Sequence, residues 1–288
     1  MIEKANQKIA CAPSRLMRFV SCAALVVPAI VGLSSEAIAG FTIFESVGAN
    51  PAAITPTRDD FRSAVGGGSV APANGDFGGL RREINWDGVG AAFSDPSLLP
   101  GGFFNINSPR GVVFSTPGTG FMVSGVAPVT TLFGFPGDLQ TFSASKLFAI
   151  VGSNVMDIQF FVPGTSTAAT TSAFAAIFVD VENNNLTRMQ FFDLSNNEIF
   201  NRTAIAGANQ SLSFLGGVAN AGEKINRVRL TMPENFLVSN FVRNNELVDF
   251  VVMDDFLYAT PSAVPEPGIW AMTLVGLALV GWRSRRRV

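Results

Sequence analysis

The chain has 288 residues and a formal net charge of −2, with 48% hydrophobic and only 15% charged residues. It contains no histidine, and its two cysteines, Cys11 and Cys22, both lie in an N-terminal segment that we expect to be removed. The rest of the chain therefore excludes disulfides, zinc sites built on Cys or His, and Ser-His-Asp or Cys-His catalytic sites, which leaves carboxylate chemistry, an oxygen-bound metal ion or no catalysis.

The N-terminal segment has the pattern of a secretory signal. Four basic residues precede an uncharged apolar run over residues 19–33, and Ala37 and Ala39 form an A-x-A cleavage site. We expect residues 1–39 to pass through the Sec translocon and to be removed by signal peptidase after Ala39. An uncleaved membrane anchor and a buried core helix are the alternatives.

The segment that remains after this cleavage is acidic. Between Gly40 and Trp282, 12 Lys and Arg residues stand against 20 Asp and Glu residues, a net charge of −8. An acidic surface repels phosphates, so nucleic acid is not an expected partner. The charge suits an exported protein or one that meets divalent cations.

Strand-like runs, rich in β-branched and aromatic residues and separated by turn residues, fill most of residues 40–260. This spacing predicts an all-β ectodomain over these residues, an antiparallel β-sandwich that is jelly-roll-like. Turn residues at 117–118 and 183–185 predict two hairpins. Residues 47–110 are expected to form long loops with short strands. The predicted strands are 41–46, 111–116, 120–125, 146–152, 156–164, 174–182, 186–194, 211–218, 225–232 and 248–259.

Two of these runs show how the strands are buried. In 225–232, Val228 and Leu230 alternate with Arg227 and Arg229, as in a strand with one buried face. In 174–181 both faces are apolar until Asp180, which predicts a central strand covered on both sides. The many phenylalanines are then expected to fill the space between two sheets.

Acidic residues provide the candidate metal ligands. Asp254 and Asp255 lie in the last strand, where successive side chains face opposite ways, so one of them should point inward or to a sheet edge. Such a residue accepts hydrogen bonds from a neighbouring loop, binds calcium, or acts in catalysis. Asp180, with Glu182 and Asn183 nearby in sequence, is a further candidate. A structural Ca²⁺ is the one cofactor that this pattern suggests, and no D-x-D-x-D-G loop supports it.

The sequence also offers residues for two kinds of sugar site. A glycoside hydrolase needs two facing carboxylates, and Glu83, Asp87, Asp180 and Asp255 are available. A sugar-binding module instead favours an exposed aromatic ring. Trp86 is the best candidate for that contact, and its alternative role is a lid packed over one end of a sheet.

The C-terminus combines an apolar run with a basic end. Residues 268–282 carry no charge and would span roughly 22 Å as a helix, less than the ~30 Å hydrocarbon core. We expect a transmembrane helix whose C-terminal side stays in the cytoplasm, because basic residues follow the run at once. These residues are Arg283, Arg285, Arg286 and Arg287.

This tail resembles the PEP-CTERM sorting signal of Gram-negative bacteria. The matching parts are a linker with the Pro-Glu-Pro motif within 261–267, the helix 268–282 and the basic end 283–288, and the motif itself is Val264, Pro265, Glu266 and Pro267. The resemblance, which covers residues 264–288, implies recognition by a membrane-embedded exosortase that cleaves near the motif. It also implies association with exopolysaccharide and biofilm.

Together these patterns predict an exported protein that is transiently anchored in the inner membrane and then delivered to the cell surface or the extracellular matrix. Its body is expected to be non-enzymatic and to act in adhesion or polysaccharide contact. The alternative is a carboxylate-dependent polysaccharide hydrolase.

Overall fold

The computed structural model describes residues 37, 38, 40–70, 72–126, 132–238, 242–244 and 248–264, all within one compact unit. The predicted transmembrane helix, its arginines and nearly all of the predicted signal lie outside these residues. No helix among the described residues has the length and apolar character needed to cross a membrane.

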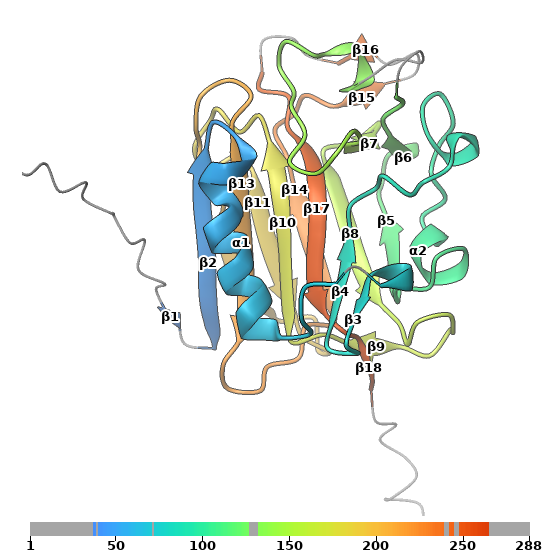
Figure 1. Ribbon diagram of the computed structural model, residues 1–288, viewed down its shortest axis with the longest axis vertical. Helices are drawn as coiled ribbons and strands as arrows, with labels where there is room; N and C mark the ends of the chain where they lie inside the picture. The colour runs from blue at the N-terminus through green and yellow to red at the C-terminus, as the bar shows by residue number, and fades with distance from the viewer. Residues whose placement is uncertain are drawn as a thin grey trace, which may run out of the picture. The chain divides into compact units, whose positions relative to one another are not determined.

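The described residues are mostly β, with few helices, as predicted (Figure 1). An eleven-stranded sheet has the strand order β1-β2-β13-β10-β17-β7-β15-β16, with β3, β4 and β6 pairing at its side. It is a mixed sheet, because β15 runs parallel to β7. Its strands are β1 (Ala37–Ile38), β2 (Phe41–Gly48), β3 (Asp76–Phe77), β4 (Arg81–Ile84), β6 (Gly120–Val123), β7 (Phe148–Val151), β10 (Ala173–Val179), β13 (Leu212–Ala219), β15 (Leu237–Val238), β16 (Val242–Arg243) and β17 (Val252–Ala259).

A second sheet is antiparallel, with five strands in the order β12-β11-β14-β8-β5. Its strands are β5 (Val112–Ser115), β8 (Val155–Phe160), β11 (Arg188–Phe192), β12 (Glu198–Thr203) and β14 (Arg227–Thr231). A small antiparallel pair joins β9 (Ala169–Thr170) to β18 (Ser262–Ala263).

Eight of these strands form four nested antiparallel pairs. β11 pairs with β12, β10 with β13, β8 with β14, and β7 with β17, and successive pairs alternate between the two sheets. Along the chain, consecutive strands of these pairs therefore cross from one sheet to the other, except at the step from β11 to β12. The two predicted hairpins are wrong for this reason, because β5 and β10 lie in different sheets from β6 and β11.

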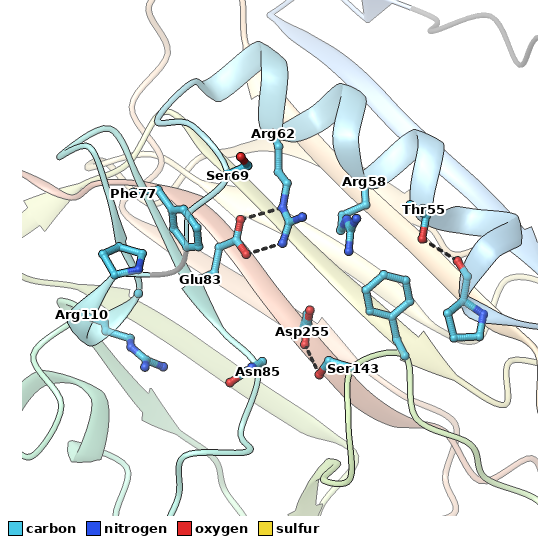
Figure 2. Close-up of a pocket in the computed structure, with 14 residues that line it drawn as sticks. Thr55, Arg58, Arg62, Ser69, Phe77, Glu83, Asn85, Arg110, Ser143 and Asp255 are labelled. Atoms are coloured by element: carbon cyan, nitrogen blue, oxygen red, sulfur yellow. Dashed lines mark hydrogen bonds and ion pairs between the residues drawn. The ribbon is translucent and has the colours of Figure 1, made fainter.

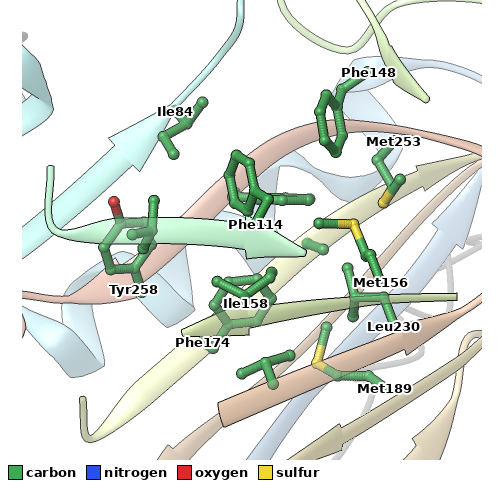
Figure 3. Close-up of a cluster of buried hydrophobic side chains, with 14 of the residues drawn as sticks. Ile84, Phe114, Phe148, Met156, Ile158, Phe174, Met189, Leu230, Met253 and Tyr258 are labelled. Carbon is green, nitrogen blue, oxygen red and sulfur yellow. The ribbon is translucent and has the colours of Figure 1, made fainter. Parts of the chain in front are cut away.

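The two sheets face each other across an aromatic core (Figure 3). Phe41 of β2 packs against Phe191 of β11 with ring centroids 5.5 Å apart, and Phe160 of β8 packs against Phe174 of β10 at 6.4 Å. Figure 3 shows Tyr258 and Phe174 beside Ile158 in this layer. The prediction that phenylalanines fill the space between two sheets is confirmed.

The predicted burial of two strands is also confirmed. β14 alternates buried and half-buried residues, with Val228 and Leu230 in the core. β10 is buried along its whole length and lies between β13 and β17. Phe174 points into the core between the sheets, whereas Ala175 packs on the outer face, the face turned away from the smaller sheet.

Helix α1 (Pro51–Val65) covers that outer face where loops were expected (Figure 1). Its start is specified locally, since the Asn50 side chain accepts a hydrogen bond from Ala53 N and Pro51 follows the cap. Ile54 and Phe61 are its buried residues and join the outer cluster with Phe214. The other helices among the described residues are α2 (Phe103–Ile106) and three short 3₁₀ turns at Ala73–Gly75, Ala91–Phe93 and Leu132–Gly134.

Gly216 of β13 should tolerate no side chain, because it lies under α1. A Cβ added there would stand 2.5 Å from the Ala175 Cβ and 3.1 Å from the Phe61 ring. We expect Gly216→Ala to lower the free energy of unfolding by about 1–3 kcal/mol through overpacking. Gly88→Ala is the matched control, because nothing lies within 4 Å of its Cβ. Chemical denaturation measures both, and equal stability of the two variants would contradict this account of the packing.

Candidate functional site

A pocket of about 420 Å³ opens on the outer face between α1, β4, β17 and two loops (Figure 2). Arg58 and Arg62, four residues apart on α1, reach into it from one helix face. Glu83 comes from β4 and Asp255 from β17. We call it the arginine pocket; its lining also includes Thr55, Phe77, Asn85, Arg110, Phe142 and Ser143.

A β-bulge in β17 forms the floor of this pocket. Ala176 pairs with Phe256 and Phe178 with Met253, so two steps along β10 match three along β17. Met253 and Phe256 therefore both point into the core. The two residues between them, Asp254 and Asp255, lie together on the outer face. The expectation that they would face opposite ways is wrong, because the bulge interrupts the alternation.

Both carboxyl groups bind the loop that crosses the pocket. Phe142 N donates to Asp254 Oδ2 at 2.6 Å, and Ser143 Oγ lies 3.1 Å from Asp254 Oδ1 and 2.8 Å from Asp255 Oδ1. Burial raises the pKa of Asp254 well above its usual value, and the neighbouring charge of Asp255 adds to this. Burial also raises the pKa of Asp255 to about 6. The pair thus shares a proton near neutral pH.

The wall of the pocket is an ion-pair network. Both oxygens of Glu83 are held by Arg62, at 2.8 and 2.6 Å, and one also by Arg81 at 2.6 Å. Arg81 is fully buried, and it donates to the carbonyls of Gly66 and Gly68 just after α1. This network ties β4 to the end of the helix.

Two further arginines present cations to the pocket. The Arg58 guanidinium lies 5.1 Å from the Phe142 ring and pairs with the exposed Asp59 at 2.8 Å. Arg110 stacks over Phe104 at 4.9 Å, and burial lowers its pKa. No ion pair formed among the described residues includes Arg110. The pocket therefore offers guanidinium groups above a floor that is partly protonated, a setting suited to anionic or hydroxyl-rich ligands.

Trp86 is not a surface contact residue. Its side chain is 1% exposed, it stacks on Phe148 with ring centroids 4.1 Å apart, and Nε1 donates to the Asp254 carbonyl at 2.7 Å. The hypothesis that Trp86 contacts a glycan is therefore wrong, because the ring is buried. Its N–H instead donates a hydrogen bond to a backbone carbonyl at the bulge, where the hydrogen-bond ladder between β10 and β17 is interrupted.

The four carboxylates considered for hydrolysis do not share one site. Glu83 and Asp255 line the arginine pocket. Asp87 accepts hydrogen bonds from Lys146 N at 3.2 Å and from Ser145 Oγ at 3.4 Å. Asp180 lines a different pocket, of about 410 Å³.

Asp180 is brought together with Glu182 and Asp249 rather than with the Asp254–Asp255 pair. One carboxylate oxygen of each of the three residues lies within 4.8 Å of the others, and we call them the acidic cluster. Glu182 was a sequence candidate. Asp249 was not, because it lies 67 residues from Glu182 and no local motif marks it.

The ends of the described body lie beside the predicted processing sites. Ala37 of β1 pairs with Thr42 of β2, and Val264 N donates to the Ala168 carbonyl at 3.1 Å. Ala39, Pro265, Glu266, Pro267 and the four arginines lie outside the described residues.

The tail is also matched by comparison with known proteins. A family profile described as the PEP-CTERM protein-sorting motif matches residues 263–287, which is the C-terminal segment only. No match is found among curated proteins or among solved structures. The resemblance of the tail is thereby confirmed, and it implies an exported protein processed by exosortase.

Stability should rise as the pH falls from about 8 to about 5. The folded-state pKa values of Asp255, about 6, and Asp180, about 7, are raised above the ordinary 3.8. Protonation of these two groups therefore stabilises the folded chain. This stabilisation is complete below pH 3.8 and is lost as the pH rises through 6 and 7. The chain has no histidine to oppose this, and Asp157, with a lowered pKa, titrates below the window. A tenfold difference in an acid dissociation constant between the folded and unfolded chain corresponds to ~1.4 kcal/mol.

Thermal unfolding of the full chain in detergent and chelator measures this effect. We expect the midpoint to increase by several degrees across that interval and Asp255→Asn to flatten the increase. A midpoint that falls steadily from pH 8 to pH 5 would contradict the assignment of a shared proton to the buried pair.

Proposed function

We propose that this chain is an exosortase-sorted surface or matrix protein whose β body contacts polysaccharide without catalysing a reaction. The observation that carries this proposal is the sorting motif at residues 263–287. Residues 1–39 are then the signal peptide, 40–260 the ectodomain and 261–288 the sorting signal. The predicted helix 268–282 would then hold the chain in the inner membrane until processing, with the terminal arginines on the cytoplasmic side.

The position of the motif supports this arrangement. The described body ends at Val264, which directly precedes Pro265. Cleavage near the Pro-Glu-Pro motif would leave strands β2 to β18 in the released product, since β1 belongs to the predicted signal peptide.

We take the ectodomain to be a jelly roll. The support is the nesting of the four pairs β7–β17, β8–β14, β10–β13 and β11–β12 in alternate sheets. Such sandwiches leave a sheet face and its loops available for binding. In this chain the outer face carries α1 and the arginine pocket.

The arginine pocket is our candidate for polysaccharide contact, and its chemistry favours an acidic polymer. A planar guanidinium can form paired hydrogen bonds with the carboxylate of a sugar acid. Arg110 is the best-placed donor, because no ion pair formed among the described residues occupies it.

Binding is a better use of this pocket than hydrolysis. Glu83 is held by Arg62 and Arg81, and Asp255 is held by Ser143 and the proton it shares with Asp254. Both carboxylates thus already have partners within the protein, which favours binding over hydrolysis. A hydrolase that uses Glu83 and Asp255 is the alternative. Measuring whether the polysaccharide is cleaved distinguishes hydrolysis from binding.

Sorting should depend on the motif. We expect Pro265→Ala combined with Glu266→Ala to leave the chain unprocessed and in the inner membrane of the native host, because exosortase recognition requires the motif. Cell fractionation and the mass of the chain measure this. Thr260→Ala combined with Ser262→Ala, upstream of the motif, is the control, and normal surface delivery of the double motif variant would show that the sorting assignment is wrong.

Arg110→Gln should weaken binding to an acidic polysaccharide by roughly tenfold or more, because a hydrogen bond to a charged group contributes about 1.5–3 kcal/mol. Binding of the full chain in detergent to a polyuronate and to a neutral dextran measures this. Arg188→Gln, on β11 of the opposite sheet, removes the same charge and should leave binding unchanged.

Two outcomes would overturn the pocket proposal. Equal binding of polyuronate by the Arg110 and Arg188 variants would place the contact elsewhere. Release of reducing ends that is abolished by Asp255→Asn would replace binding with hydrolysis.

A further inference from the structure

The acidic cluster is assembled from two distant segments. Asp180 follows β10 with φ of 67°, a left-handed conformation that turns the chain out of the sheet and towards Glu182. Asp249 precedes β17, and its Oδ2 accepts hydrogen bonds from Glu182 N at 2.8 Å and Asn183 N at 3.3 Å. These backbone contacts fix the three carboxylates within reach of one another.

Asp249 also has an oxygen without a partner. Asp249 is 7% exposed, and its side-chain atom Oδ1 is buried and accepts no hydrogen bond. A buried carboxylate oxygen without a hydrogen-bond partner destabilises the folded chain. Because this carboxylate lines the pocket beside Asp180, a bound cation would supply the missing partner.

The local charges also favour a cation. The pocket contains four carboxylates, Asp138, Asp180, Glu182 and Asp249, and one arginine, Arg243. Arg243 is held by Asp138 at 2.8 Å. Burial, followed by the charges of Asp249, Glu182 and Asp138, raises the pKa of Asp180 to about 7.

We propose that Asp180, Glu182 and Asp249 form a calcium-binding site that joins the end of β10 to the start of β17. Ca²⁺ takes six to eight oxygen ligands in flexible geometry. The three carboxylates supply the charged ligands, and Asn183 and Asn209 in the same pocket bring further amide oxygens. The site has no sulfur or imidazole ligand, so softer metals are disfavoured.

This site lies apart from the polysaccharide contact. None of its three carboxylates lines the arginine pocket, so calcium binding and polysaccharide binding can fail independently. The ion would brace the two strands, β10 and β17, that run side by side through the larger sheet.

Thermal unfolding of the full chain in detergent at pH 8 tests the proposal. Exported modules bind Ca²⁺ with dissociation constants of about 10⁻⁴–10⁻³ M, so about 10 mM CaCl₂ should raise the midpoint by about 3–10 °C over chelator. Asp249→Asn should abolish this shift without unfolding the protein, because it also removes repulsion between like charges. Asp60→Asn, an exposed residue of α1, is the matched control and should keep the full shift.

A second control separates calcium binding from ionic screening. An equal shift from NaCl at matched ionic strength would show screening alone and would overturn the proposal. So would a full calcium shift in the Asp249 variant, or no calcium shift at pH 8.

Discussion

One extra residue in β17 determines the character of the outer face. Without the bulge opposite β10, Asp254 and Asp255 would lie on opposite faces, and one carboxyl group would enter the aromatic core. With the bulge, both carboxyl groups accept hydrogen bonds from the loop at Phe142 and Ser143, and the Asp254 carbonyl accepts a hydrogen bond from the Trp86 indole N–H. The bulge thus joins β4, β17 and this loop into the base of a pocket.

β10 and β17 connect the core to both candidate sites. Their paired apolar faces pack on the smaller sheet on one side and on the α1 layer on the other. The bulge between them creates the floor of the arginine pocket, and the turn at Asp180 places the acidic cluster where β10 ends. Both sites therefore lie beside two fully buried strands of the larger sheet, and burial of their acidic groups is the main reason that their pKa values rise.

The parts of the fold that were predictable are those encoded in local periodicity. The alternation in β14 and the two apolar faces of β10 gave both strands and their burial, and the PEP-CTERM tail was readable from residues 264–288 alone. The hairpins were wrong because a turn sequence specifies a reversal of the chain but not the sheet that the next strand joins. Helix α1 was missed although Asn50 and Pro51 are good start signals, since the glycine-rich residues after it suggested loops. The bulge and Asp249 depend on pairing between distant segments, which no single sequence window contains.

The lack of histidine gives buried carboxyl groups a role that histidine usually has. In most proteins the imidazole titrates between pH 5 and 8, but in the described part of this chain the raised pKa values of Asp180 and Asp255 occupy that interval. Such groups are sensitive to protons and cations at once, because either one neutralises a buried charge that the fold cannot hydrate. An exported protein meets external pH and external cations directly. The stability of the folded body is therefore expected to depend on pH in this interval through carboxyl groups, without imidazole or thiol.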